Sequence, residues 1–153
     1  NDTKINNVLF EKGGVAPLVV VDLDTVMPGL VGHDFGDAIR FAANRQAEDS
    51  RELELVVLDL DIFRAFAEGF LDMTAKTLTS NEVDTLAHSC FVLAAELATR
   101  FLADYILGDP YFNINCPDHN LARTRCQIAL AKDVLKKMEQ MNEIVRSCVE
   151  AAC

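Results

Sequence analysis

The sequence predicts an α+β domain that is mostly helical and carries one β-hairpin near its N-terminal end. Two short β-type runs flank a Gly-Gly turn within the first 30 residues, and apolar residues then recur at three-and-four spacing over most of the chain. The chain has 153 residues, of which 50% are hydrophobic and 25% are charged. That length and balance fit one compact domain, residues 1–153, with a buried core.

The hairpin is expected between residues 8 and 21. Residues 8–10 and 18–21 are rich in Val, Leu and Phe, which favour strands. The segment between them contains Glu11-Lys12-Gly13-Gly14, a turn signal. The two runs therefore predict an antiparallel pair that turns the chain back on itself.

Four helices are expected after the hairpin: residues 35–43, residues 61–73, a helix that begins at a capping box (Thr79 to Glu82) and closes at Gly108, and residues 121–149. Their apolar stripes predict core packing rather than a cofactor or membrane role. On the three long helices the residues expected to face inward are Ile62, Phe63, Phe66 and Phe70; Val83, Leu86, Cys90, Leu93, Leu97, Phe101 and Tyr105; and Ile128, Ala131, Leu135, Met138, Val145 and Cys148.

Charge and composition exclude several classes of function. The net charge of −10 argues against a nucleic-acid groove, which needs clustered Lys and Arg. No apolar run approaches the roughly 20 residues of a membrane span, so no membrane partner is expected. Five cysteines without a Cys-x-x-Cys pair favour free thiols and a cytoplasmic location. The three histidines match no zinc-site spacing.

The residues that could carry chemistry are concentrated at the N-terminal end. Asp2, Lys4 and Asn7 directly precede the hairpin, and Asp22 follows its second strand. Phosphoryl transfer needs a carboxylate to orient and deprotonate the attacking hydroxyl, a cation near the γ-phosphate, and hard oxygen ligands for Mg²⁺. Asp2, Lys4 and the pair Asn7–Asp22 fit these roles in that order. The hairpin explains the spacing, because it can return Asp22 to face Asn7 across one metal site.

The motifs also resemble a known family. Residues 19–29 (VVVDLDTVMPG) and 34–40 (DFGDAIR) resemble the aminoglycoside phosphotransferase and choline kinase superfamily, and most closely its N-acetylhexosamine 1-kinases. Residues 2–10 resemble the catalytic loop of that subgroup, and the likeness extends to residues 100–112. The resemblance implies a protein-kinase-like fold, of which this chain would be the mostly helical C-terminal lobe. The hairpin would carry the catalytic loop and the metal-binding Asp.

Roles follow from the resemblance, position by position. It implies that Asp2 is the catalytic base, and that Asn7 and Asp22 bind Mg²⁺ and with it ATP. Asp24 would reach a second metal ion or a sugar hydroxyl. Arg100 and Tyr111 would bind the acetamido sugar. The implied reaction is ATP-dependent phosphorylation of the anomeric hydroxyl of N-acetylglucosamine or N-acetylgalactosamine.

The chain also departs from the family pattern. A His stands at position 33 where the family commonly has an aromatic residue, and no Gly-rich loop or strand Lys for the phosphates is present. The resemblance therefore implies an N-terminal nucleotide lobe outside this chain, without which the chain is expected to be inactive. Asp34-Phe35-Gly36 matches the metal-binding triplet of protein kinases, but it lies far from Asn7 and opens a helix. We therefore assign the metal to Asp22 and expect Asp34 to be a structural carboxylate that accepts backbone amides near the catalytic loop.

Two other functions remain open at this point. One is a kinase of the same superfamily with another acceptor. An aminoglycoside suits an acidic domain, whereas choline is disfavoured because the chain has no Trp and only two Tyr with which to build an aromatic cage. The other is a non-catalytic helical interaction module with a vestigial kinase loop.

Overall fold

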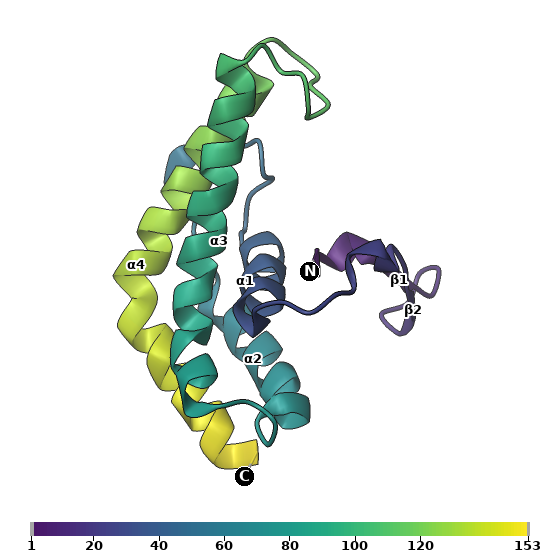
Figure 1. Cartoon of the computed structure of the whole chain (residues 1–153), viewed down its shortest axis with the longest axis vertical. Helices are drawn as coiled ribbons and strands as arrows, with labels where there is room; N and C mark the ends of the chain where they lie inside the picture. The colour runs from purple at the N-terminus through teal and green to yellow at the C-terminus, as the bar shows by residue number, and fades with distance from the viewer. Residues whose placement is uncertain (1, 153) are drawn as a thin grey trace.

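The fold is a long antiparallel helix pair with two shorter helices on one side and a hairpin beyond them. The computed structural model describes residues 2–152. Figure 1 shows α3 and α4 running side by side in opposite directions, with α1 and α2 against them and the β1–β2 hairpin set apart from the helices. The elements are β1 (Val8–Phe10), β2 (Pro17–Val20), α1 (Val31–Ala42), α2 (Leu60–Thr74), α3 (Ser80–Ile106) and α4 (His119–Ala152), with short 3-10 turns η1 (Ile5–Asn7), η2 (Leu23–Thr25) and η3 (Leu53–Leu55).

The predicted hairpin is confirmed. β1 and β2 pair antiparallel, with Val8 opposite Val20 and Leu9 opposite Val19. In the turn, the amide of Gly14 donates to the carbonyl of Glu11 at 2.9 Å, and Gly13 has a φ of 78°. Glycine adopts that left-handed conformation without a Cβ penalty, which explains the Gly-Gly signal.

The mostly helical α+β class and the four helices are also confirmed, with shifted ends. The α3 capping box is present: the Thr79 hydroxyl accepts from the Glu82 amide, and the Glu82 carboxylate accepts from the Thr79 amide. Helix α1 begins at Val31, four residues before the predicted start, so Asp34 lies in its first turn. The N-cap of α2 is Asp59, whose carboxylate accepts from the amides of Asp61 and Ile62.

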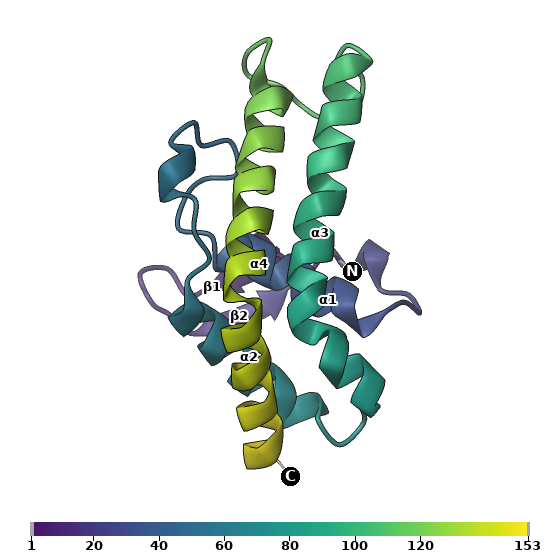
Figure 2. The ribbon, with the colours of Figure 1, turned by 90° about the vertical axis from the view of Figure 1, so that its left-hand side faces the viewer.

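The core lies where α1 and α2 meet the α3–α4 pair. Figure 2, turned by 90° from Figure 1, shows α3 and α4 in front with α1 and α2 behind them. Phe35 of α1 is completely buried, and its ring meets the rings of Phe63 and Phe66 edge-on. Cys90, predicted to face inward, is buried, and so is Cys126; four of the cysteines (Cys90, Cys116, Cys126 and Cys148) are free. The fifth, Cys153, lies outside the described residues.

The predicted inward faces are partly wrong on two helices. On α2, Ile62 is 40% exposed. On the last long helix, α4, the outcome is mixed. Ala131, Val145 and Cys148 are buried, but Ile128 is 41% exposed and Leu135 is 48% exposed. Helix α4 packs against both α3 and α2, and the buried residues at its centre are Cys126, Leu130, Val134 and Met141. Ile128 and Leu135 lie instead along a groove between α3 and α4.

Among residues 2–152, one helix, α3, is long and apolar enough to cross a membrane by length and composition alone. In this fold it packs between α1 and α4 and contributes Leu86, Cys90 and Ala94 to the core. Those contacts are the ones a core helix makes.

Candidate functional site

Three of the predicted catalytic-loop residues form one hydrogen-bonded unit. The Lys4 ammonium lies 2.8 Å from Oδ2 of Asp2. The amide nitrogen of Asn7 donates to the Asp2 carbonyl at 2.9 Å and to Asp2 Oδ2 at 3.3 Å. Both donors therefore hold the Asp2 carboxylate in one orientation. The side-chain nitrogen of Asn7 is engaged by Asp2, which leaves the side-chain oxygen of Asn7 as the atom that can bind a metal ion.

The hairpin brings Asp22 back toward this unit. The amide of Val21 donates to the carbonyl of Asn7 at 2.8 Å, which extends the β1–β2 pairing by one step and places Asp22 directly after it. Asp22 has a φ of 63° and Asp2 a φ of 59°. Left-handed backbone is uncommon for residues other than glycine and clusters at functional sites, although Asp tolerates it better than most.

Lys4 lies at the electrostatic centre of this arrangement. Its pKa is raised above the usual lysine value, chiefly by the hydrogen bond to Asp2, against the opposing effect of partial burial. The charges of Asp2, Asp22 and Asp37 raise it further. Three carboxylates thus act on one ammonium group, which is charged at neutral pH.

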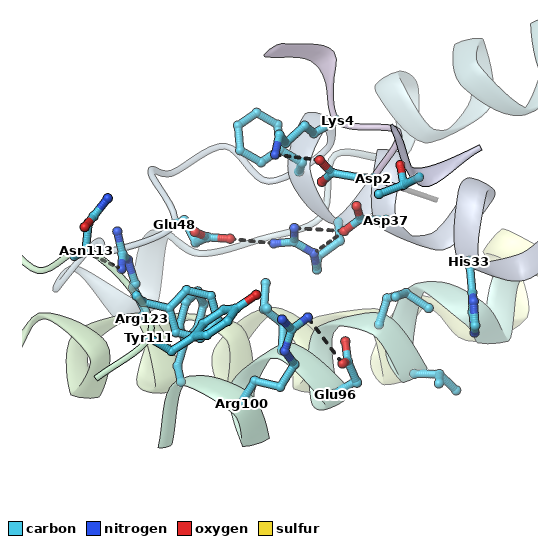
Figure 3. Close-up of a pocket in the computed structure, with 18 residues that line it drawn as sticks. Asp2, Lys4, His33, Asp37, Glu48, Glu96, Arg100, Tyr111, Asn113 and Arg123 are labelled. Carbon is cyan, nitrogen blue, oxygen red and sulfur yellow. Dashed lines mark hydrogen bonds and ion pairs between the residues drawn. The ribbon is translucent and has the colours of Figure 1, made fainter. Parts of the chain in front are cut away.

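A cavity of about 730 Å³ joins the catalytic loop to the distant sugar-binding candidates. Asp2 and Lys4 line it from one side, and Arg100 and Tyr111 line it from the other (Figure 3). These two pairs are separated by about 100 positions in the sequence, yet they share one concave surface. The predicted catalytic residues Asp2 and Lys4 therefore share one cavity with Arg100 and Tyr111, whereas Asp24, also predicted to reach a sugar hydroxyl, does not line it.

The Arg100 side of the cavity is an aromatic platform. The guanidinium carbon of Arg100 lies 5.9 Å from the ring centre of Tyr111 and 5.6 Å from that of Phe112. The loop that carries both rings is anchored by buried Asp104, which accepts the amides of Tyr111 and Phe112 at 3.0 Å. This anchor fixes Tyr111 at the cavity although its side chain is exposed.

The predicted metal ligands are placed less uniformly. Asn7 is buried beside Asp2, whereas Asp22 and Asp24 are exposed, and neither is among the described residues that line the cavity. Within residues 2–152, no group of three or more His, Cys, Asp or Glu side chains is arranged to hold a metal ion. The oxygen of Asn7 and the carboxylate of Asp22 are nevertheless hard ligands of the kind Mg²⁺ takes from proteins, which usually supply one or two carboxylates beside phosphates and water.

Asp34 lies next to the predicted catalytic loop, but the contact between them is made by its backbone; acceptance of backbone amides by its carboxylate stays a prediction. The hydroxyl of Thr3 donates to the backbone carbonyl of Asp34 at 2.6 Å. This bond ties the loop to the first turn of α1 and so fixes the loop relative to the helices.

Sequence reasoning missed five charged residues that line the same cavity: Asp37, Arg40, Glu48, Glu96 and Arg123. Arg40 is 7% exposed, and its guanidinium contacts Asp37 at 2.9 Å and Glu48 at 2.7 Å. The three-residue spacing of Asp37 and Arg40 on α1 was a visible signal for a helical ion pair. Glu48 gave no such signal, because it lies in an irregular segment beyond the helix.

No protein-family model matches this sequence.

Proposed function

We propose that this chain is the C-terminal lobe of an ATP- and Mg²⁺-dependent sugar kinase with a protein-kinase-like fold. Its reaction would transfer the γ-phosphoryl group of ATP to the anomeric hydroxyl of N-acetylglucosamine or N-acetylgalactosamine. The observation that carries the proposal is the shared cavity. Asp2, which has the position and partners of a general base, opens onto the same space as Arg100 and Tyr111.

In this proposal Asp2 accepts the proton of the attacking hydroxyl. Lys4 and Asn7 hold its carboxylate in place, which favours the productive orientation before the sugar arrives. The positive charge of Lys4 lies beside the reacting atoms and would also stabilise negative charge that develops on the transferred phosphoryl group.

The oxygen of Asn7 and the carboxylate of Asp22 would hold the metal ion. Asp24, the next carboxylate along the chain, would reach a second ion or a sugar hydroxyl. Mg²⁺ would supply charge neutralisation on the phosphate oxygens of ATP. The chain itself contributes ligands and positioning.

The balance of charge in the cavity favours an uncharged acceptor. Among the described residues that line it, four carboxylates face four permanent cations: Asp2, Asp37, Glu48 and Glu96, and Lys4, Arg40, Arg100 and Arg123. The chain as a whole carries −10, so the cavity is much less acidic than the rest of the molecule. An aminoglycoside, which is a polycation, would gain little in a balanced site. A sugar can hydrogen-bond to both kinds of side chain and lay an apolar ring face on Tyr111.

The exposed apolar surface of residues 15–30 supports a docking role for this part of the chain. Monomeric proteins rarely expose large contiguous apolar patches unless something binds there. In the proposal the N-terminal nucleotide lobe of the same protein covers this surface. The same exposed surface also favours the alternative of a non-catalytic interaction module. Calorimetry of Mg·ATP binding to the full-length protein separates the two functions, since only the kinase binds the nucleotide. The exposed residues are Val15, Leu18, Val19, Val20, Val21, Leu23, Val26, Met27 and Leu30.

The proposal is tested with Asp2→Asn in the full-length protein. Because asparagine keeps the shape of the side chain and cannot accept the proton, we expect kcat for N-acetylglucosamine to fall roughly 100-fold or more, with an unchanged circular dichroism spectrum. Asp72→Asn, an exposed carboxylate on α2 that does not line the cavity, is the matched control and should keep wild-type turnover. Near-normal turnover of Asp2→Asn would refute the role of this residue.

A further inference from the structure

We propose that Glu48 and Asp37 form a hydroxyl-binding subsite of the cavity, and that buried Arg40 is the residue that positions them. The subsite would accept hydrogen bonds from ring hydroxyls of an uncharged sugar, next to the hydroxyl that is phosphorylated. This inference rests on the proposed kinase function and adds to it the residues that recognise the rest of the ring.

Arg40 connects the two carboxylates. Its Nε and Nη2 atoms both contact Oδ1 of Asp37 at 2.9 Å, and its Nη1 donates to Oε1 of Glu48 at 2.7 Å. A guanidinium group is planar, so two carboxylates bound to its edges are held in a fixed relative geometry. Figure 3 shows Asp37 and Glu48 on either side of this contact, between the Asp2–Lys4 pair and the Arg100–Tyr111 pair.

Each carboxylate uses one oxygen for Arg40 and keeps the other available. Within the described part of the chain, no hydrogen bond engages Oδ2 of Asp37 or Oε2 of Glu48. Neither atom is among the buried side-chain oxygens that lack a partner. The side chains are 15% and 28% exposed, and both residues line the cavity. The available oxygens are therefore acceptors that a ligand in the cavity can reach.

The loop that carries Glu48 is fixed on both sides of it. The Cys126 thiol donates to the carbonyl of Ala47 at 3.4 Å. On the other side, Oδ2 of Asp49 lies 3.0 Å from Nε2 of buried His119. Nδ1 of His119 accepts from the backbone amide of Asn115. In that tautomer the ring proton is on Nε2, which donates to Asp49. An anchored loop lets Glu48 bind a ligand without first losing conformational freedom.

Charge and position indicate which part of the substrate the subsite takes. Two carboxylates and one guanidinium leave a net charge of about −1, which disfavours phosphate and favours hydroxyl donors. Asp37 is close enough to Lys4 for its charge to raise the pKa of that lysine. The subsite therefore lies beside the catalytic loop, where other hydroxyls of the reacting ring would fall.

The test is Glu48→Gln in the full-length enzyme. The glutamine oxygen can still accept from Arg40, but the amide nitrogen replaces the available acceptor with a donor. We expect KM and the calorimetric Kd for N-acetylglucosamine to rise about 10-fold or more, with kcat changed much less. Glu52→Gln, in the same loop but exposed and outside the cavity, should leave both unchanged. Thermal unfolding of each variant reports whether it is folded.

Monodeoxy analogues of N-acetylglucosamine identify the contact. One analogue should lose about 10-fold in affinity for the wild type and nothing further for Glu48→Gln, because variant and analogue remove the same hydrogen bond. The inference is overturned if Glu48→Gln binds N-acetylglucosamine as tightly as the wild type does, or if all analogues lose affinity for the variant to the same extent. It is also overturned, without any variant, if every analogue binds the wild type as tightly as the parent sugar. A wild type that neither binds nor phosphorylates any of these sugars would instead refute the proposed kinase function and remove the basis of the subsite.

Discussion

At Gly36 only a hydrogen atom fits between α1 and α3. A Cβ built there would lie 2.7 Å from the backbone oxygen of Ser89 and 2.9 Å from its hydroxyl. Backbone atoms at that distance must move, so we expect Gly36→Ala to lower the free energy of unfolding by about 1–3 kcal/mol. Urea denaturation measures this. Gly69→Ala is the control, because nothing lies within 4 Å of its Cβ and alanine favours helix, so this variant should be equally stable or gain up to about 1 kcal/mol. Equal losses in both variants would mean that the close approach is not rigid.

At the candidate site, contacts between residues close in sequence could be predicted, whereas contacts between distant residues could not. Asp2, Lys4 and Asn7 lie within six positions of one another, so their pairing could be predicted from local spacing. Arg100 and Tyr111 were connected to them only through the family resemblance, and the fold places all these residues on one cavity except Asn7, which is buried beside Asp2. The pairing of Arg40 with Glu48 depends on the path of an irregular loop, and no periodicity encodes that path.

Among the helices, start signals were easier to predict than packing faces. The α3 capping box follows from Thr79 and Glu82, whose reciprocal hydrogen bonds depend only on local geometry. The inward face of α4 depends on which helices surround it. A 34-residue helix that packs against both α3 and α2 need not bury one continuous stripe, so the apolar pattern alone placed Ile128 and Leu135 wrongly.

The N-cap of α2 makes that element sensitive to acid. Hydrogen bonds from the amide of Ile62 and from Arg45 hold the pKa of Asp59 below its usual value. A carboxyl with a lowered folded-state pKa stabilises the protein fully above its unfolded pKa of 3.8, and this contribution is lost as the pH falls. An asparagine side chain at the same position would still cap the helix but would not titrate. As the pH is lowered from about 5 to about 3, we therefore expect the free energy of unfolding to fall less for Asp59→Asn than for the wild type.

Urea unfolding at several pH values within that range measures the two slopes. Asp61→Asn is the matched control, because the Asp61 side chain makes no hydrogen bond or ion pair with any other described residue. Its slope should follow that of the wild type. If the slope of Asp59→Asn also follows it, the cap carboxylate does not contribute to acid sensitivity.

As a whole, the molecule joins a packed helical body to a weakly supported hairpin. The core residues lie between positions 35 and 148, whereas β1 and β2 expose most of their side chains. Both parts could be predicted from the sequence, because helical and strand periodicities are local. Their unequal burial could not, since it depends on what each part contacts in three dimensions.

This difference in burial predicts a difference in local stability. A two-stranded hairpin without a covered face is marginally stable, and its amides should open far more often than those of the core helices. In hydrogen exchange on this chain, we expect the amides of Leu9 and Val19 to exchange at least about 100-fold faster than those of Leu86 and Leu130, which are completely buried in α3 and α4. In the full-length protein the proposed nucleotide lobe covers the hairpin, so the same amides should become slow while those of α3 and α4 change little. Equal protection of hairpin and helices in this chain alone would show that the hairpin is stable without a covering partner, and its exposed apolar residues would then no longer support docking.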